Sequence, residues 1–187
     1  MPMIDRSTLV KLALGALLVL LAAGLSGVLL REPLIRWGEA FIGRFGLVGL
    51  FFGVIFADSS IVPLSNEPLV LLALSAGVSP WTAFAVTAAG SVASGPVGWC
   101  CGRLLGAHTS IVLRLARRYP QVAAMLTLYG SRFVAAAALL PFPFAVATWL
   151  SGASGVRFSH LLLASLLRIP KTAFYVGLLA GGWALGG

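Results

Sequence analysis

The sequence predicts an all-α integral membrane protein that crosses the bilayer several times. Its 187 residues are 59% hydrophobic and only 10% charged, and the mean hydropathy is +1.01. A soluble globule of this length needs more polar side chains to cover its surface. Uncharged runs of helical length alternate with short polar or basic gaps, and several runs are too short to span. The net charge of +8 is carried by basic residues in these gaps, so no nucleic-acid surface is predicted.

Residues 1–45 contain one predicted span and one interfacial helix. Residues 12–30 are uncharged and follow Arg6 and Lys11, which predicts a retained membrane anchor in place of a cleaved signal peptide. In residues 31–45, bulky apolar side chains share one helical face and charged side chains the other, so we expect this helix to lie in the membrane interface. A solvated connecting helix is the alternative.

Residues 46–187 are predicted to form a membrane domain of two re-entrant helical hairpins, each followed by a transmembrane helix. In the first hairpin, residues 46–77, neither apolar arm is long enough to cross about 30 Å of hydrocarbon at about 1.5 Å per residue. Non-helical backbone is tolerated at this depth only where protein or a water-filled cavity satisfies it, so the tip between the arms should face inward. A spanning helix over residues 78–101 follows.

The second half repeats this plan in the opposite sense. Residues 102–121 carry four arginines and no acidic residue, which places this segment and the N-terminus on the cytoplasmic side. The uncharged run 133–156 is cut by Pro141 and Pro143 into two short arms that form the second hairpin. The final helix, residues 158–186, is interrupted by basic residues; either it runs through with cations at depth, or it is a short tilted span. The two units amount to an inverted repeat, which in transporters places the substrate near the midplane.

Two acidic residues, Asp58 and Glu67, flank Pro63 in the polar tip of the first hairpin. A charged side chain at the centre of a membrane helix costs about 2.5 to 3.5 kcal/mol on insertion scales, so an idle one is not expected in lipid. We expect both carboxylates to face a cavity as proton-linked sites. In the alternative, the tip is a hydrated extracellular loop with solvated carboxylates.

A basic pair, Arg168 and Lys171, lies at helical spacing around Pro170 in the final helix. Residues three apart share a helix face, and proline removes an amide and frees a carbonyl there. Facing a cavity, the two cations could hold an anionic head group. The alternative is that they extend toward the membrane boundary and reach the head-group region.

Three glycines, Gly98, Gly102 and Gly106, recur at intervals of four beside Arg103, which predicts close packing of this helix against another. His108 has no second ligand at helical spacing, and no serine has a base nearby in a recognisable motif. Neither an enzyme, a metal site nor a cofactor is predicted.

Two stretches of the chain resemble the DedA family, also called the VTT or SNARE-associated Golgi protein family. The first is Asp58-Ser-Ser-Ile-Val-Pro63-Leu-Ser-Asn-Glu67-Pro, which is similar to the first re-entrant loop of that family. The second is Gly95-Pro-Val-Gly98-Trp-Cys-Cys-Gly102-Arg103-Leu-Leu-Gly106, which is similar to its glycine-rich helix end. The basic segment of the final helix is similar to the short YqaA-type branch.

The resemblance implies a flippase or scramblase in the bacterial cytoplasmic (inner) membrane, which moves phospholipids or polyprenyl phosphates and is coupled to protons. It implies that Asp58 and Glu67 are the acidic pair of the first loop. The second loop of the family commonly has Arg, two residues, Pro, two residues, Arg; around Pro141 those positions hold Ala138 and Phe144. A phosphate-binding role would then have to come from elsewhere, and the basic pair of the final helix could compensate.

Two alternatives stay open beside the lipid transporter. One is a membrane scaffold or chaperone that kept the fold and does not transport. The other is a proton-coupled carrier of a small solute. The transported species, its direction and the oligomeric state are not specified by the sequence.

Overall fold

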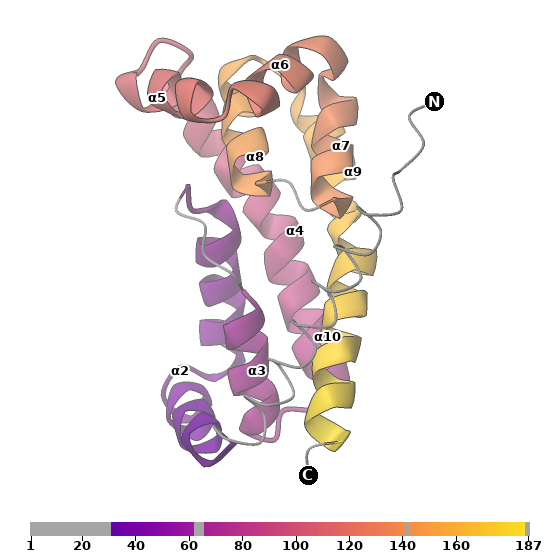
Figure 1. Cartoon of the computed structure of the whole chain (residues 1–187). Helices are drawn as coiled ribbons and strands as arrows, with labels where there is room; N and C mark the ends of the chain where they lie inside the picture. The colour runs from indigo at the N-terminus through magenta and orange to yellow at the C-terminus, as the bar shows by residue number, and fades with distance from the viewer. Residues whose placement is uncertain (1–30, 62–65, 141–142, 186–187) are drawn as a thin grey trace, which may run out of the picture.

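The computed structural model describes residues 31–61, 66–140 and 143–185, and within these ranges the chain forms helices joined by short turns, without strands (Figure 1). The predicted all-α class is therefore confirmed. The predicted span over residues 12–30, and Pro63 and Pro141 at the two tips, lie outside the described residues. The described helices are α2 (Arg31–Ser59), α3 (Glu67–Ser75), α4 (Pro80–Leu105), α5 (Ser110–Arg118), α6 (Pro120–Tyr129), α7 (Ser131–Leu139), α8 (Phe144–Ala153), α9 (Phe158–Leu166) and α10 (Arg168–Leu185).

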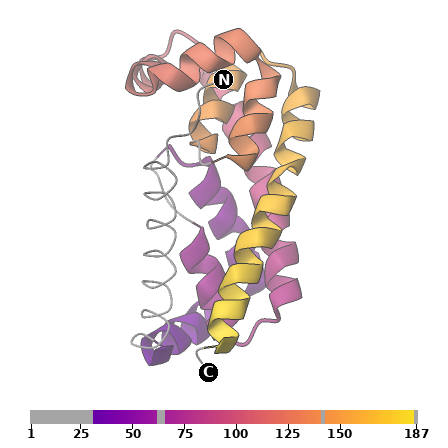
Figure 2. The same cartoon turned by 45° about the vertical axis from the view of Figure 1, so that its right-hand side comes forward.

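The long helix α4 runs through the molecule, and the other helices form two groups along it (Figure 1). One group, α2, α3 and α10, lies along the half of α4 that begins at Pro80. The other group, α7, α8 and α9, lies along the half that ends at Leu105. Helices α5 and α6 lie across the end of the bundle beyond α8, as both views show (Figure 2).

Helix α2 is divided at Gly46, whose φ of 60° and ψ of −161° are not helical. Glycine adopts a positive φ without the steric conflict that a Cβ would cause. The amphipathic part, residues 31–45, therefore turns away from the apolar part, residues 47–59 (Figure 1). At about 1.5 Å per residue the apolar part covers about 20 Å, less than the hydrocarbon thickness of about 30 Å.

Helices α9 and α10 follow one another as a nearly continuous rod. Leu167 between them keeps a right-handed helical conformation, and its amide donates to the carbonyls of Ala164 and Ser165. Pro170 falls in the first turn of α10, where a missing amide proton costs no helical hydrogen bond. Together the two helices form one apolar segment, Phe158–Ala184, that is long enough to cross a membrane and contains Arg168 and Lys171.

Three of the described helical segments are long and apolar enough to cross a membrane: Glu32–Ser59, Pro80–Leu105 and Phe158–Ala184. The first of these includes the break at Gly46. Large apolar side chains on the outside of the bundle are widely exposed, among them Trp81 at 80%, Leu104 at 87% and Phe174 at 70%. Exposed apolar surface on this scale needs a hydrocarbon environment, and the protein is an integral membrane protein.

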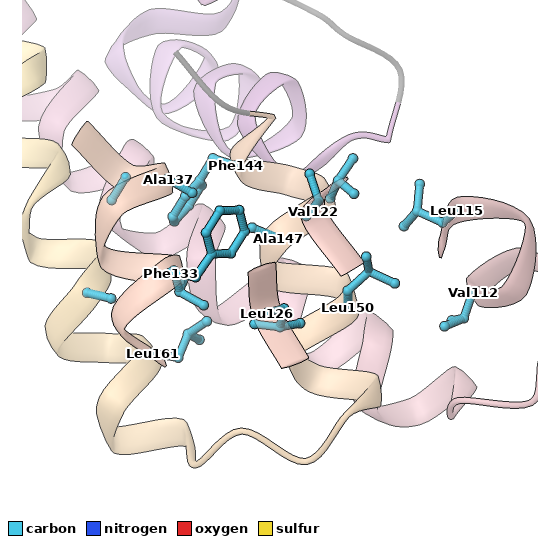
Figure 3. Packing of buried hydrophobic residues seen from close by; sticks show 14 residues of the cluster. Val112, Leu115, Val122, Leu126, Phe133, Ala137, Phe144, Ala147, Leu150 and Leu161 are labelled. Carbon is cyan, nitrogen blue, oxygen red and sulfur yellow. The ribbon is translucent and has the colours of Figure 1, made fainter. Parts of the chain in front are cut away.

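The largest buried apolar cluster takes side chains from all five helices between α5 and α9 (Figure 3). Phe133 of α7, Phe144 of α8 and Leu161 of α9 belong to it. Val112 and Leu115 extend it to α5, which with α6 lies across the end of the bundle. This packing buries the apolar face of α5 and leaves its three arginines exposed: Arg114, Arg117 and Arg118.

Helices α4 and α8 cross at a contact that only glycine allows. A Cβ added to Gly98 would collide with the side chain of Thr148, and one added to Gly102 would collide with the backbone of Trp149. From the other helix, a Cβ at Gly152 would collide with the backbone around Trp99. Backbone atoms cannot move aside as a flexible side chain can, so the two helices depend on these glycines for their distance.

We expect Gly102→Ala to lower the free energy of unfolding by about 1–3 kcal/mol or more, because the added methyl group overpacks a contact with backbone. The matched control is Gly177→Ala in α10, where a Cβ meets open space and the better helix propensity of alanine should stabilise by about 0.5–1 kcal/mol. Denaturant unfolding of the protein in detergent measures both. Equal effects of the two substitutions would contradict the close crossing.

Candidate functional site

The candidate site lies near the middle of α4, where the broken helices end. The last turn of α2, the first turn of α8 and the junction of α9 with α10 all lie at this level (Figure 1). Each such helix end carries backbone groups that lack intrahelical partners. The polar side chains of the site come from these ends and from the buried face of α4.

A buried ion pair occupies the centre of the site. Nη2 of Arg168 lies 2.6 Å from Oδ2 of Asp58, and the two side chains are 7% and 10% exposed. Nε of Arg168 donates to Oγ of Ser91 at 2.6 Å, and that hydroxyl in turn donates to Oδ2 of Asp58, also at 2.6 Å. Nδ2 of Asn66 donates to the same carboxylate oxygen at 3.1 Å. Four segments of the chain are therefore joined through one carboxylate.

The guanidinium of Arg168 also stacks on an aromatic ring. Its Cζ lies 4.3 Å from the centroid of Phe144, the first residue of α8. A desolvated cation–π contact of this kind contributes about 2 kcal/mol. Phe144 is one of the two positions where the family resemblance led us to look for arginine. The structure thus brings the cation of Arg168 from α10 against the ring of Phe144 at the start of α8.

Trp149 ties α8 to the end of α2. Its Nε1 donates to the carbonyl oxygen of Ser59 at 2.9 Å, across 90 positions of sequence. This carbonyl is one of the groups at the α2 terminus that the helix itself cannot satisfy. The bond fastens the first group of helices to the second beside the ion pair.

Lys171 and Glu67 lie at the edge of the site. Lys171 is half-buried one turn along α10 from Arg168, and its electrostatic neighbours are Arg168, Asp58 and Glu67. Within the described residues Lys171 forms no hydrogen bond or ion pair. Glu67 is exposed at the first turn of α3, where a carboxylate also complements the helix dipole. The structure therefore separates the two predicted carboxylates into one largely buried and one exposed group.

The other predicted residues lie outside this cluster. Pro143 is exposed and caps the N-terminus of α8. Gly98 and Gly102 lie in the α4–α8 crossing, whereas Gly106 ends α4 with a φ of 74° and has open space around it. Arg103 is exposed in the last turn of α4, where a cation complements the helix dipole.

Ser91 and Asn66 are site residues that the sequence reasoning missed. Ser91 lies on the buried face of α4 with Ser94 and Thr87, at intervals of three and four residues. Polar side chains at this spacing in an otherwise apolar span were the signal that would have found it. Among the described residues, no three His, Cys, Asp or Glu side chains are grouped so that they could hold a metal ion.

We expect Asp58→Asn and Arg168→Met each to cost about 3–5 kcal/mol of stability, because each leaves the partner charge buried and unpaired. The double substitution should cost much less than the sum, since no uncompensated charge is left. Unfolding of the wild type, the two single variants and the double variant in detergent gives the double-mutant cycle. Glu67→Gln, at an exposed position, is the control. Additive single costs would show that the two charges do not interact.

Comparison with known proteins identifies the family. The chain matches the family model of the VTT domain over residues 62–181, which is more than half of its length. No curated protein and no solved structure matches the chain. The match covers α3 to α10 almost entirely, including every described residue of the site except Asp58 and Ser59 at the end of α2. The protein belongs to the VTT-domain family, the DedA/SNARE-associated Golgi family.

Proposed function

We propose that the protein moves lipids with an anionic head group, such as a phospholipid or a polyprenyl phosphate, between the two leaflets of a membrane. The buried ion pair of Asp58 and Arg168 is the observation that carries the proposal. Charged residues inside a membrane are costly and mark ion or substrate pathways. A buried pair adds little net stability compared with well-packed apolar residues, so a purely structural role explains its retention poorly.

The guanidinium of Arg168 is the proposed phosphate ligand. A planar guanidinium matches phosphate oxygens with paired hydrogen bonds, as it does those of a carboxylate. Asp58 and the head group are thus competitors for one cation. Lys171, half-buried beside the pair and without an ion-pair partner among the described residues, supplies a second positive charge.

Protonation of Asp58 is the proposed switch. A proton bound to the carboxylate cancels its charge and weakens its hold on Arg168, which then binds the anionic head group. Loss of the proton restores the ion pair and expels the head group. The bonds of the lipid stay intact throughout, so the proposed activity is transport and not catalysis.

The arrangement of the short helices supports this proposal. The apolar part of α2 with α3, and α7 with α8, are pairs of short helices that lie along opposite halves of α4 (Figure 1). We interpret them as two re-entrant hairpins of an inverted repeat, in which the end of α2 at Asp58 and the start of α8 at Phe144 lie beside the ion pair. We place the arginines of α5 in the cytoplasm with the N-terminus, in the inner membrane of a bacterium.

Proteoliposomes with a fluorescent phospholipid test the proposal. A quencher added outside should reach label from both leaflets in the presence of the wild-type protein, and label of the outer leaflet alone in empty liposomes. Arg168→Gln and Asp58→Asn should slow this exchange by about tenfold or more, which corresponds to a loss of about 1.4 kcal/mol or more in the barrier. Arg132→Gln, at an exposed position of α7, is the control.

The variant Asp58→Asn/Arg168→Met separates folding from transport, because it removes both charges together and leaves neither unpaired. It should remain folded and still fail to move lipid. A pH gradient should change the rate of the wild type and leave that of Asp58→Asn unaffected. Labelled lipid that stays in its leaflet, while a solute flux appears, would favour a small-solute carrier. Neither flux, with an intact cellular phenotype in Asp58→Asn, would favour a scaffold.

A further inference from the structure

The seam between α4 and α10 continues below the ion pair in a regular antiparallel register. Arg168 of α10 contacts Ser91 of α4, and Val176 of α10 shares a buried cluster with Ala83 of α4. Arg168 and Val176 are as far apart along α10 as Ser91 and Ala83 are along α4, and the two helices run in opposite directions (Figure 2). From this register we infer that Thr87 of α4 and Thr172 of α10, midway between these positions, lie at the same level.

Three hydroxyl groups are buried along this seam. Thr87 is 0% exposed and Thr172 is 1% exposed. The hydroxyl of Tyr175, almost one turn further along α10, is also buried and lies beside the side chain of Thr172. Among the described residues, Thr87 Oγ1 finds no partner in hydrogen-bonding geometry, and the Tyr175 hydroxyl has the Thr172 side chain beside it without meeting strict hydrogen-bond geometry. A buried polar group without a partner is costly and is usually satisfied by bound water.

Other buried hydroxyls near the site behave differently. Each of four donates to a backbone carbonyl of its own helix, three or four residues earlier in the chain: Ser94, Thr148, Ser151 and Ser165. The hydroxyl of Thr87 makes no such bond. Its capacity to donate and to accept is therefore free for a ligand within the seam.

We propose that the seam binds water between the hydroxyls of Thr87, Thr172 and Tyr175, and that this water extends the hydrogen-bond network of Ser91 and Asp58 along α10. Two or three polar partners are enough to hold a buried water. Hydroxyls and water both donate and accept hydrogen bonds. A hydrogen-bonded series of these groups therefore passes a proton along as each hydrogen bond shifts in turn. A proton that enters at the Tyr175 end leaves one proton on Asp58, and the intermediate groups are unchanged.

The charged and titratable groups around this seam belong to three elements. Asp58 of α2 and Glu67 of α3 are the acidic ones, and Arg168, Lys171 and Tyr175 of α10 are the others. Helix α4 faces them with hydroxyls. The role of the water as a proton route rests on the proposed function, whereas the presence of the water does not.

Hydroxyl-radical footprinting of the protein in nanodiscs tests for the water, because radiolysis of bound water oxidises side chains beside it. We expect Tyr175 to be oxidised, and Thr87→Val to reduce its oxidation several-fold. Thr87→Ser, which keeps the hydroxyl, should retain the labelling. Thr148→Val is the matched control, since that hydroxyl already bonds to the carbonyl of Ala145. A Tyr175 that stays unlabelled, or is labelled equally in Thr87→Val, would overturn the proposal.

The melting temperature of Thr87→Val provides a second readout. If water is bound, the substitution removes one of its partners, and the melting temperature should fall. If the seam is dry, valine replaces an unsatisfied hydroxyl by a group of the same shape, and the melting temperature should rise. A rise would overturn the proposal. Tyr175 labelling in a protein that moves no lipid would support the water site and reject only the transport proposal. Lipid movement without Tyr175 labelling would support the transport proposal and reject the water site.

Discussion

A charge placed inside a membrane needs a partner, and in this protein the partner comes from far away in the chain. Asp58 at the end of α2 and Arg168 at the start of α10 are separated by 110 positions, and Ser91 of α4 bonds to both. The pair therefore fixes the relative positions of three helices. The ends of α2 and α8 lie at the same level because each contributes to the surroundings of this pair: the carboxylate from α2 and the ring of Phe144 from α8.

The same arrangement limits how stable the site is. Removing two charges from water costs several kcal/mol for each ion, and the hydrogen bonds of Ser91 and Asn66 offset part of that cost. Arg168, Ser91 and Asn66 all bond to the same carboxylate of Asp58, so a change of its protonation or a competing anion alters several contacts at once. The interactions that are most sensitive to a change of charge therefore lie where the proposed transport requires Asp58 to bind and release a proton.

The sequence predicted the breaks in the helices better than the contacts between them. The helical class, the division at Gly46 and the interruption before Phe144 follow from local hydropathy, glycine and proline. Asp58 and Arg168 were each singled out as charges within apolar segments, but nothing local indicates that they pair with each other. Ser91 and Asn66 were missed because their roles depend on that long-range pairing. Glu67 was grouped with Asp58 by proximity in sequence, yet helix α3 begins there and presents it outward.

The small residues on α4 have a consequence for motion. Along the site, the buried surface of this helix consists of glycine and serine: Gly90, Ser91, Ser94, Gly95, Gly98 and Gly102. Such a surface carries no large side chains that interlock with a neighbour, so adjacent helices have few protrusions to clear when they slide by a small distance. The neighbours of α4 therefore pack against it at backbone distance, and any relative movement of the two helix groups has to keep these close contacts.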